Sequence, residues 1–447
     1  MKPNILIVVI DALRADKFFG NSKTSFTPFI DLLIGKGVYF EQAISISDVT
    51  GKSMGSVFTG KYPFKTKMSN RNYNEKINTF FNLLKKNGYS NFATVPNLTW
   101  FNKLTKDFDG ADNYFSTLST NEGLSDGVGK IIIERLKSKK MIQPWIYYIH
   151  LEDIHGKIIV PQEFENEKFG KTKYEKMLSS IDSHIKEIID CVDLENTLVI
   201  ITSDHGEYVT SIEKDSIPRI HSIFKKGKTL FPVLEPLGVK LLNTLYETDD
   251  KLWKNKMKEK LSEDEFRSLN VRGSKEVLFD EALRIPLLIL GKQFPSKKIN
   301  ALVTSMDIFP TILDKIGIDY EKNDIDGKSL LEIIEGKEIE DYPIFIESGD
   351  TSKHDGGFVV GIRTSKYKYF RTKIDDKNKR KLFNIILDPG EKNNLVDDEP
   401  GIVKKMEAEL DIFLNECLKY ENQKDEQEMS LDEMKKIEDE LKKLGYV

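Results

Sequence analysis

Cysteine and histidine are scarce in this sequence, and long uncharged apolar stretches are missing from it. Of the 447 residues, two are cysteines (Cys191 and Cys417) and six are histidines. Two cysteines so far apart exclude a disulfide scaffold and a cysteine-rich metal site. No stretch reaches the roughly 18 apolar residues that a transmembrane helix needs, so no membrane span is expected.

The sequence also lacks an excess of charge of one sign. It has 67 Lys and Arg against 72 Asp and Glu, a net charge of -5. A slightly acidic balance without a basic block argues against a nucleic-acid partner. The hydrophobic fraction of 39% is enough for a sizeable core. At about 150 residues per domain the length allows roughly three domains, and a large α/β enzyme domain can take up most of it.

The apolar run near the N-terminus predicts a buried strand and not a signal peptide. Residues 5–10 form a short run that ends in Asp11, with Arg14 soon after and no small-residue cleavage site. We therefore expect a cytoplasmic protein. The sequence leaves the oligomeric state open, with a homo-oligomer as one option.

Alternating strand and helix patterns predict the fold class. The β-branched run at residues 5–10 is typical of a strand buried on both faces of a parallel sheet. Similar runs lie at residues 145–149, 197–201 and 285–290, and helical patterns lie at 28–36, 77–87 and 174–192. We expect an α/β sandwich, with a large, mostly parallel sheet between helices and the chemistry at the carboxyl ends of its strands.

Two changes of pattern suggest the domain organisation. Residues 1–342 are expected to form the catalytic α/β domain, with a highly charged insertion at about 208–272 near the active site. Beyond residue 343 the pattern changes to short strands and turns, followed by a helix at about 400–420. We expect residues 343–447 to form a smaller α+β domain with an antiparallel sheet and terminal helices.

Polar residues that can bind metals follow the predicted core strands. Asp11 ends the first run, His150 ends the second with His155 close behind, and Asp204 and His205 follow the third. Each has an ordinary structural explanation: Asp11, for example, could cap a helix at residues 12–18. Several strand ends share such residues, and the chain has so few histidines that they are not expected to cluster by chance. The pattern therefore favours a metal site.

A loop that runs into a helix at residues 48–63 carries a candidate nucleophile. A hydroxyl at a helix N-terminus lies where backbone N–H groups and the helix dipole favour an anion. A neighbouring metal ion would activate that hydroxyl. Taken alone, this segment favours the simpler interpretation that Thr50 or Ser53 is an N-cap.

Together these segments resemble the sulfatase branch of the alkaline phosphatase superfamily, and the resemblance is collinear over nearly the whole chain except the insertion. In the first half of the chain it covers the first strand with its metal-binding Asp (residues 4–16), the nucleophile helix ending in Thr-Gly-x-Tyr-Pro (50–63) and the "HxxDPH" segment (150–155). Further along it covers the second metal motif (204–207), the "YDEALRVP" segment (275–286) and the C-terminal motifs (304–330 and 361–395).

The resemblance implies an alkaline-phosphatase-like fold and a metal-dependent hydrolase of small anionic esters. Counting back from Thr59 places Thr50 at the nucleophile position. Asp11, Asp204 and His205 would then bind a divalent ion, with Thr50 as a further ligand. One ion is expected and not two, because no complete second set of Asp and paired His ligands is seen.

The remaining site residues are expected to handle the substrate. His155 is implied as a general acid or anion-binding group, supported by His150 as a further catalytic residue and by Asp153 in substrate binding. Lys52 and Lys275 would help to balance the developing negative charge, and His221 in the insertion is a weaker substrate-binding candidate.

The departures from the family pattern bear on the chemistry. Threonine cannot become formylglycine, which sulfatases make from Cys or Ser. Lys52 and Met54 replace the usual Pro and Arg, Ala12 replaces a second Asp, and the second metal motif is Asp-His in place of Asp-Asn. These changes resemble the phosphonate monoester hydrolase and phosphodiesterase side of the family. An imidazole ligand favours Mn²⁺ or Zn²⁺, with Ca²⁺ or Mg²⁺ as alternatives.

Three alternatives to a phosphodiesterase-like hydrolase stay open. The first is a true sulfuric ester hydrolase. The second is a phosphoryl transferase, since phosphoethanolamine-type transferases of the superfamily use a Thr nucleophile but usually carry membrane spans. The third is a binding or regulatory module that has lost activity, against which the surviving ligand set argues.

Overall fold

The computed structural model describes residues 2–115, 122–209, 253, 255–259, 261, 263–271, 278–349, 359–372 and 379–421. The chain divides into two compact units, Met1–Glu207 with Lys275–Val447, and Tyr208–Ser274. Most of the expected insertion at 208–272 lies outside the described residues, and α11 (Glu263–Val271) is its longest described element. The fold below is that of the first unit.

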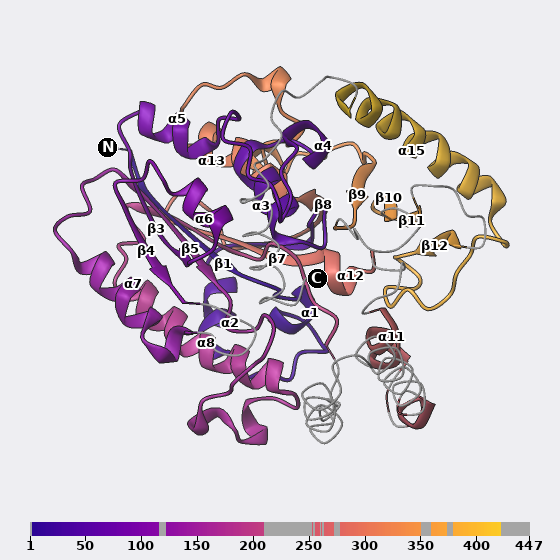
Figure 1. Cartoon of the computed structure of the whole chain (residues 1–447), viewed down its shortest axis with the longest axis horizontal. Coiled ribbons are helices and arrows are strands. Elements are labelled where there is room, and N and C mark those ends of the chain that lie inside the picture. The colour runs from indigo at the N-terminus through magenta and orange to yellow at the C-terminus, as the bar shows by residue number, and fades with distance from the viewer. Residues whose placement is uncertain are drawn as a thin grey trace, which may run out of the picture. The chain divides into compact units, whose positions relative to one another are not determined.

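An eight-stranded sheet forms the centre of this unit, in the order β4-β3-β5-β1-β6-β7-β2-β8 (Figure 1). Its strands are β1 (Asn4–Ile10), β2 (Val38–Ile44), β3 (Ser90–Pro96), β4 (Gly110–Tyr114), β5 (Trp145–Leu151), β6 (Thr197–Thr202), β7 (Arg284–Leu290) and β8 (Lys297–Thr304). All neighbours pair in parallel except that β7 is antiparallel to both β6 and β2. The prediction of a large, mostly parallel sheet is confirmed.

Helices cover both faces of this sheet (Figure 1). The odd-numbered residues Ile5, Ile7 and Val9 of β1 share a core with α3 (Thr50–Thr59), α5 (Phe80–Lys86), α6 (Thr99–Leu104), α13 (Ile308–Ile316) and α14 (Leu331–Ile334). On the other face lie α2 (Pro28–Ile34), α7 (Val128–Lys137) and α8 (Lys173–Ile189). Because every residue of β1 is buried, its continuous apolar run is what a strand between two helical layers requires.

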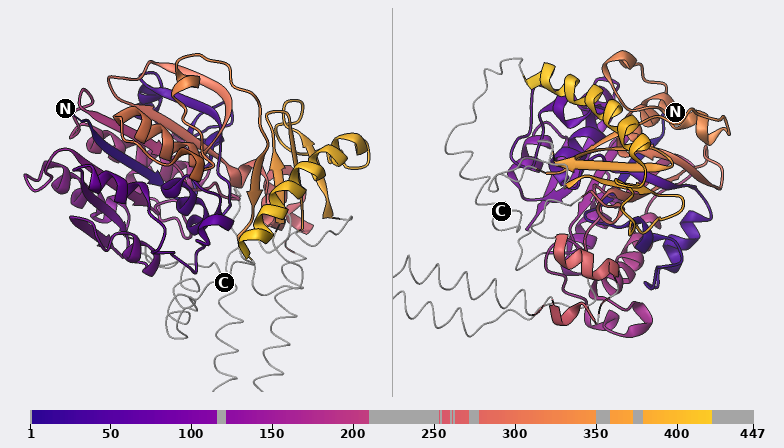
Figure 2. Two further views of the ribbon diagram at one scale, coloured as in Figure 1. Left: turned by 90° about the horizontal axis from the view of Figure 1, so that it is seen from above. Right: turned by 90° about the vertical axis from the view of Figure 1, so that its right-hand side faces the viewer.

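A four-stranded antiparallel sheet follows in the chain, in the order β12-β11-β10-β9 (Figure 2). It contains β9 (Ile344–Glu347), β10 (Val359–Arg363), β11 (Tyr367–Thr372) and β12 (Lys381–Asn384). The long helix α15 (Pro400–Glu421) comes after it, where the sequence predicts a helix. The small C-terminal sheet is therefore confirmed, whereas a domain boundary at residue 343 stays a prediction.

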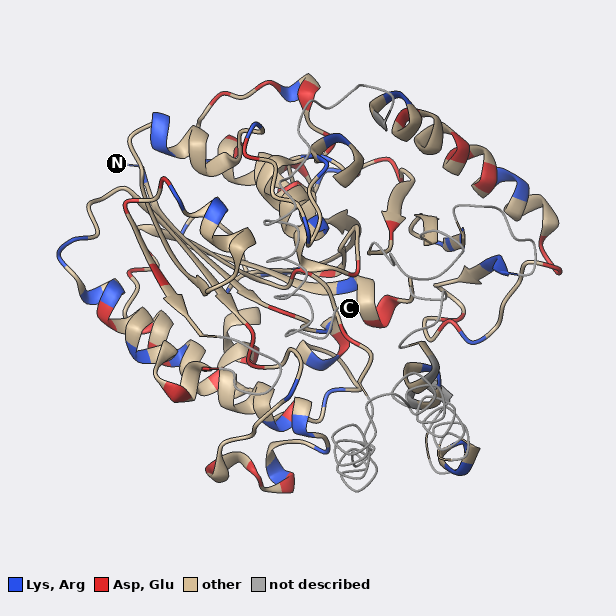
Figure 3. Cartoon of the chain, viewed as in Figure 1, with Lys and Arg blue, Asp and Glu red and all other residues tan. Residues whose placement is uncertain are grey.

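Both signs of charge are scattered along the outer helices α7, α8 and α15 (Figure 3). Among the described helices, none is both long and apolar enough to cross a membrane.

Candidate active site

The register of the central strands aligns three carboxylates at one edge of the sheet. Ile10 of β1 pairs with Leu151 of β5, and Val9 pairs with Thr202 of β6. Continued past the strand ends, this register places Asp11 between Glu152 and Asp204. All three residues are buried, with exposed fractions of 1%, 4% and 0%.

A left-handed turn at Ala12 directs the chain away from the sheet immediately after Asp11. Ala12 has a φ of 63°, its N–H donates to Asp204 Oδ1 at 3.2 Å, and its carbonyl accepts from the Tyr174 hydroxyl at 2.8 Å. The following helix α1 (Ala15–Phe18) begins only at Ala15. Asp11 therefore does not cap it, which removes the ordinary structural explanation for this residue.

Asp11, Asp204 and His205 form a group that fits a metal ion, because their ligand atoms lie within 4.8 Å of one another. His205 Nε2 is 3.4 Å from Asp204 Oδ2 and 3.8 Å from Asp11 Oδ1. Within the described part of the chain, neither of these carboxylate oxygens has a hydrogen-bond partner. Buried carboxylate oxygens without partners are costly, so the donor set fits a divalent cation.

The ring of His205 is oriented as a metal ligand requires. Its Nδ1 lies 2.7 Å from the Gly206 carbonyl oxygen, which can only accept, so Nδ1 carries the hydrogen and Nε2 faces the carboxylates. Burial alone would lower the pKa of His205, but Asp204 and Asp11 outweigh it and raise the pKa to about 9. A cation bound here would take the place of the proton on Nε2.

Thr50 is the first residue of α3, and its side chain reaches this group. Its hydroxyl Oγ1 lies 3.4 Å from Asp11 Oδ2 and 3.5 Å from His205 Nε2. The next residue, Gly51, packs directly on the Ser69 backbone, where an added Cβ would lie 2.4 Å away. At the positive end of a ten-residue helix, the Thr50 hydroxyl is well placed to meet an anion.

His150 lies behind Asp11 and is fully buried. Its Nε2 is 3.2 Å from Asp11 Oδ2, and its Nδ1 is 2.7 Å from the Tyr148 hydroxyl. With both ring nitrogens engaged, His150 orients Asp11, which agrees with its expected supporting role. A direct part in catalysis, the stronger prediction, is not favoured by this geometry.

His155 and Asp153 face different surroundings. The ring of His155 lies 6.5 Å from that of His205, and its general-acid role stays a prediction. Asp153 Oδ1 accepts from the Leu124 N–H at 2.8 Å, and burial raises its pKa to about 6. Its carboxylate therefore holds the turn at Leu124–Asp126, which argues against the predicted contact with substrate.

The side chain of Lys52 forms an ion pair and a hydrogen bond at the end of β9 in the C-terminal sheet. Its ammonium lies 3.1 Å from Glu347 Oε1 and 3.0 Å from the Ser348 carbonyl oxygen. A side chain already neutralised by Glu347 is a poor ligand for a substrate anion, so the geometry disfavours the predicted substrate-binding role. Lys275 and His221, the two other predicted substrate-handling residues, lie outside the described residues.

Glu152 belongs to the site, although the motifs in the sequence do not predict it. It shares a second group with Asp11 and His155, whose ligand atoms also lie within 4.8 Å of one another. The signal was present in the sequence, because Glu152 follows β5 as directly as Asp11 follows β1.

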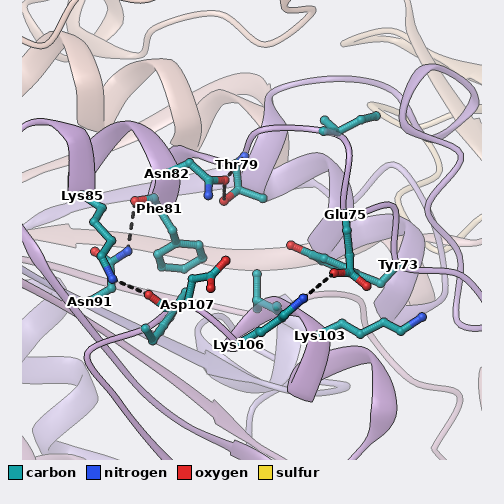
Figure 4. A pocket seen from close by; sticks show the side chains of 13 residues that line it. Tyr73, Glu75, Thr79, Phe81, Asn82, Lys85, Asn91, Lys103, Lys106 and Asp107 are labelled. Atoms are coloured by element: carbon teal, nitrogen blue, oxygen red, sulfur yellow. Dashed lines mark hydrogen bonds and ion pairs between the residues drawn. The ribbon is translucent and has the colours of Figure 1, made fainter.

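A small pocket of about 70 Å³ lies elsewhere, beside α5 and the start of β3 (Figure 4). Two of its three lysines face acidic groups: Lys106 lies 3.4 Å from Glu75, and Lys85 lies 3.5 Å from Asp109. Asn91, which lines it, is the second residue of β3. The pocket is therefore at the amino ends of the parallel strands, whereas Asp11 and Asp204 follow their carboxyl ends.

Comparison with known proteins gives matches along nearly the whole chain. The family model described as Sulfatase matches residues 3–318, and the model described as N-sulphoglucosamine sulphohydrolase, C-terminal, matches residues 273–418.

Relatives of known name cover most of the chain at low identity. Arylsulfatase K of Rattus norvegicus is 19% identical over 92% of this chain and 78% of its own length. Choline-sulfatase of Rhizobium meliloti (strain 1021) is 23% identical over 90% of this chain and 84% of its own length. The solved structure of a 2-O GAG sulfatase superposes with a TM-score of 0.65 at 17% identity, covering 93% of each chain.

Proposed function

Since the chain belongs to the sulfatase family of ester hydrolases, we propose that it hydrolyses phosphate or sulfate esters through a covalent intermediate on Thr50, with phosphodiesters or phosphonate esters preferred. The proposal depends on one observation. The Thr50 hydroxyl lies within 3.5 Å of both Asp11 Oδ2 and His205 Nε2, at the N-terminus of α3.

Asp11, Asp204 and His205 would hold the metal ion, with Thr50 as a further ligand. When bound, a divalent ion would lower the pKa of the hydroxyl and withdraw charge from the ester oxygens. The mixed carboxylate and imidazole donors favour Mn²⁺ or Zn²⁺ over Ca²⁺.

The covalent step requires little from the protein beyond position and charge. Thr50 Oγ1 forms a bond to the phosphorus or sulfur atom, the bond to the departing oxygen breaks, and the alcohol leaves with a proton. Water then attacks the same atom and restores the free hydroxyl. The N–H groups of the first turn of α3 would stabilise the negative charge that develops on the non-bridging oxygens.

The preference for phosphorus esters follows from the residue type. A formylglycine enzyme expels sulfate from a gem-diol, and threonine cannot form one. The ester on Thr50 must therefore be cleaved by attack at the central atom. Sulfate ester hydrolysis is the second candidate, and the names of the relatives, arylsulfatase K and choline-sulfatase, favour it.

A substrate panel with Thr50 variants tests both parts. Aryl phosphate diesters, phosphonates, phosphate monoesters and sulfates would be compared on wild-type protein loaded with Mn²⁺ or Zn²⁺. Thr50→Ala should lower kcat by about 10³-fold or more, while the Asp and His ligands keep the metal bound. Thr50→Ser, which retains a hydroxyl, should keep part of the activity.

Two results would contradict the proposal. Full activity of Thr50→Ala would remove Thr50 as the nucleophile, and a strong preference for aryl sulfates would make the second candidate correct. Adding glycerol as an acceptor checks the transferase alternative, because a transferase would yield the glycerol ester in place of free phosphate.

A further inference from the structure

A serine at the start of α7 faces a histidine of α8, away from the residues at the strand ends. Ser125 lies in the short 3-10 helix Leu124–Asp126, and the helices α7 and α8 lie side by side (Figure 1). Ser125 Oγ is 3.1 Å from His184 Nε2, and His184 Nδ1 is 3.6 Å from Glu187 Oε2. A hydroxyl, an imidazole and a carboxylate thus stand in the order in which serine hydrolases use them.

The direction of these hydrogen bonds follows from Ser180, a buried residue of α8. Its hydroxyl lies 3.5 Å from Ser125 Oγ and has no other side-chain partner in the described part of the chain. A buried hydroxyl without an acceptor is costly, so Ser180 donates to Ser125. Ser125 then donates its own hydrogen to His184 Nε2, and the ring carries its hydrogen on Nδ1, toward Glu187. In this tautomer the histidine can accept the proton of the serine.

The imidazole of His184 also has the charge that a general base needs. Burial lowers the pKa of His184 below its usual 6.5, and the attraction of Glu187 and Glu163 does not restore it. The ring is therefore neutral at neutral pH. Ser125 and Glu187 are both exposed, so a substrate can reach the hydroxyl from the solvent.

Two glycines shape the turn that holds Ser125. Gly127 has a φ of 121°, a conformation that suits glycine. A Cβ on Gly123 would lie 2.5 Å from Asp153 Oδ1, the oxygen that accepts from the Leu124 N–H. The segment Gly-Leu-Ser-Asp-Gly matches the G-x-S-x-G pattern of serine esterases, although a 3-10 turn and not a strand end carries the serine here.

Helix α7 brings partial positive charge to this group. It begins at Val128, three residues after Ser125, and no side chain caps its first turn. Gly129 in that turn packs on the imidazole, since a Cβ there would lie 3.3 Å from His184 Nδ1. The N–H groups at the start of a helix favour a nearby negative charge. They can therefore stabilise the oxyanion that forms when a serine attacks a carbonyl group.

We propose that Ser125, His184 and Glu187 form a second catalytic site, which cleaves small carboxylic esters and shares no residue with the proposed metal site. Ser125 Oγ bonds to the carbonyl carbon as its proton passes to His184 Nε2. The bond from that carbon to the alcohol oxygen then breaks, and the alcohol leaves with the proton. Water attacks the acyl carbon and gives a proton to His184 Nε2, which returns it to Ser125 Oγ as the acid departs.

A fluorophosphonate probe and aryl acetates test the site on metal-free protein, in which the proposed reaction at Thr50 lacks its cation. Mass spectrometry should find the probe on Ser125 of the wild type. Ser125→Ala should lose this label and the cleavage of aryl acetates. His184→Gln should slow both reactions by about 100-fold or more, because it removes the general base. Ser296→Ala, at an exposed serine directly before β8, is the matched control and should react like wild type.

Two results would overturn the proposal. One is a folded wild-type protein in which Ser125 takes up no probe. The other is equal labelling of Ser125 in wild type and His184→Gln, with circular dichroism showing that both are folded. Thr50→Ala should cleave aryl acetates as fast as wild type, so a failure of the reaction proposed for Thr50 would leave this second site intact.

Discussion

Two groups of largely buried charged side chains differ in which side chains face their carboxylates. The strand-end cluster consists of Asp11, Glu152, His155, Asp204 and His205 at the edge of the large sheet. The bridging cluster consists of Asp280, Arg363, Lys368 and Glu391, and it joins α12 (Asp280–Leu283) to the small sheet.

The bridging cluster balances its own charge. Lys368 Nζ lies 2.6 Å from Asp280 Oδ1 and 2.5 Å from Glu391 Oε1, and Arg363 Nη2 lies 3.8 Å from Asp280 Oδ2. Two cationic side chains thus face two carboxylates. In the strand-end cluster, by contrast, the carboxylates of Asp11 and Asp204 face the imidazoles of His150 and His205 at 3.2–3.8 Å. A buried carboxylate cluster indicates a metal site when its partners are imidazoles, because an imidazole can exchange its proton for a metal ion.

The largest effect is expected in the bridging cluster. Lys368→Met should lower the free energy of unfolding by about 3–5 kcal/mol, because it leaves two buried carboxylates without their ammonium. Denaturant unfolding of the metal-free protein measures this change. Lys366→Met, at an exposed position two residues away, is the matched control and should stay within about 0.5 kcal/mol of wild type. Equal stability of Lys368→Met and wild type would show that the two clusters do not differ in this way.

A substitution in the strand-end cluster should have an intermediate effect, which lowers the affinity for the metal ion and leaves the stability of the fold unchanged. Asp204→Asn removes one of several neighbouring negative charges but keeps an oxygen for the N–H groups of Ala12 and His205. Metal-free Asp204→Asn should be at least as stable as metal-free wild type.

Its affinity for the metal ion should fall by about 100-fold or more, or ~2.7 kcal/mol. Metal titration and denaturant unfolding measure the two quantities, with the exposed Asp193→Asn as control. If Asp204→Asn destabilised the metal-free protein as severely as Lys368→Met, the carboxylate would be structural.

The smallest effect is a change in how stability depends on pH. Burial, which outweighs the attraction of Lys368, raises the pKa of Glu391 from 4.5 to about 7. The folded state therefore binds the Glu391 proton more tightly than the unfolded state does. The resulting contribution to the free energy of unfolding is complete below pH 4.5 and is lost as the pH rises through 7. Glu391→Gln should make the free energy of unfolding flatter over this range. Asp280 has a lowered pKa, so its ionisation changes the free energy of unfolding only in more acidic solution. An unchanged slope in Glu391→Gln would mean that this carboxyl ionises at its ordinary pKa.

Much of the fold could be predicted from apolar runs, because strands buried on both faces leave an uninterrupted pattern. The runs at β1, β5, β6 and β7 were recognised on this basis. Strands β2, β3, β4 and β8 were not, since polar residues interrupt them: β4 reads Gly-Ala-Asp-Asn-Tyr, and β8 opens with two lysines. The reversed direction of β7 also left no sign in its own residues, because a buried antiparallel strand has the same composition as a parallel one.

The candidate site was partly predictable for a different reason. Asp11, Thr50, Asp204 and His205 follow element boundaries that the sequence marks, and the structure brings them together. Glu152 was overlooked because its partners depend on the pairing of β1 with β5, which local pattern does not reveal. The sequence suggests a substrate role for Lys52, because its partner Glu347 lies almost 300 residues away in the chain and no local pattern reveals it.

The reversed strand β7 has a consequence for how the protein matures. Because β7 runs antiparallel, its leading helix α12 lies at the catalytic edge, where the Ala282 carbonyl accepts from the Gly206 N–H at 2.7 Å. Helix α12 is in turn held by Lys368 and Glu391, which the ribosome adds late. During synthesis the loop that carries Asp204 and His205 thus lacks its supports until most of the chain has emerged. A nascent or truncated chain would hold the proposed nucleophile Thr50 long before the proposed metal site was complete, so we expect hydrolytic activity only after the C-terminal sheet is in place.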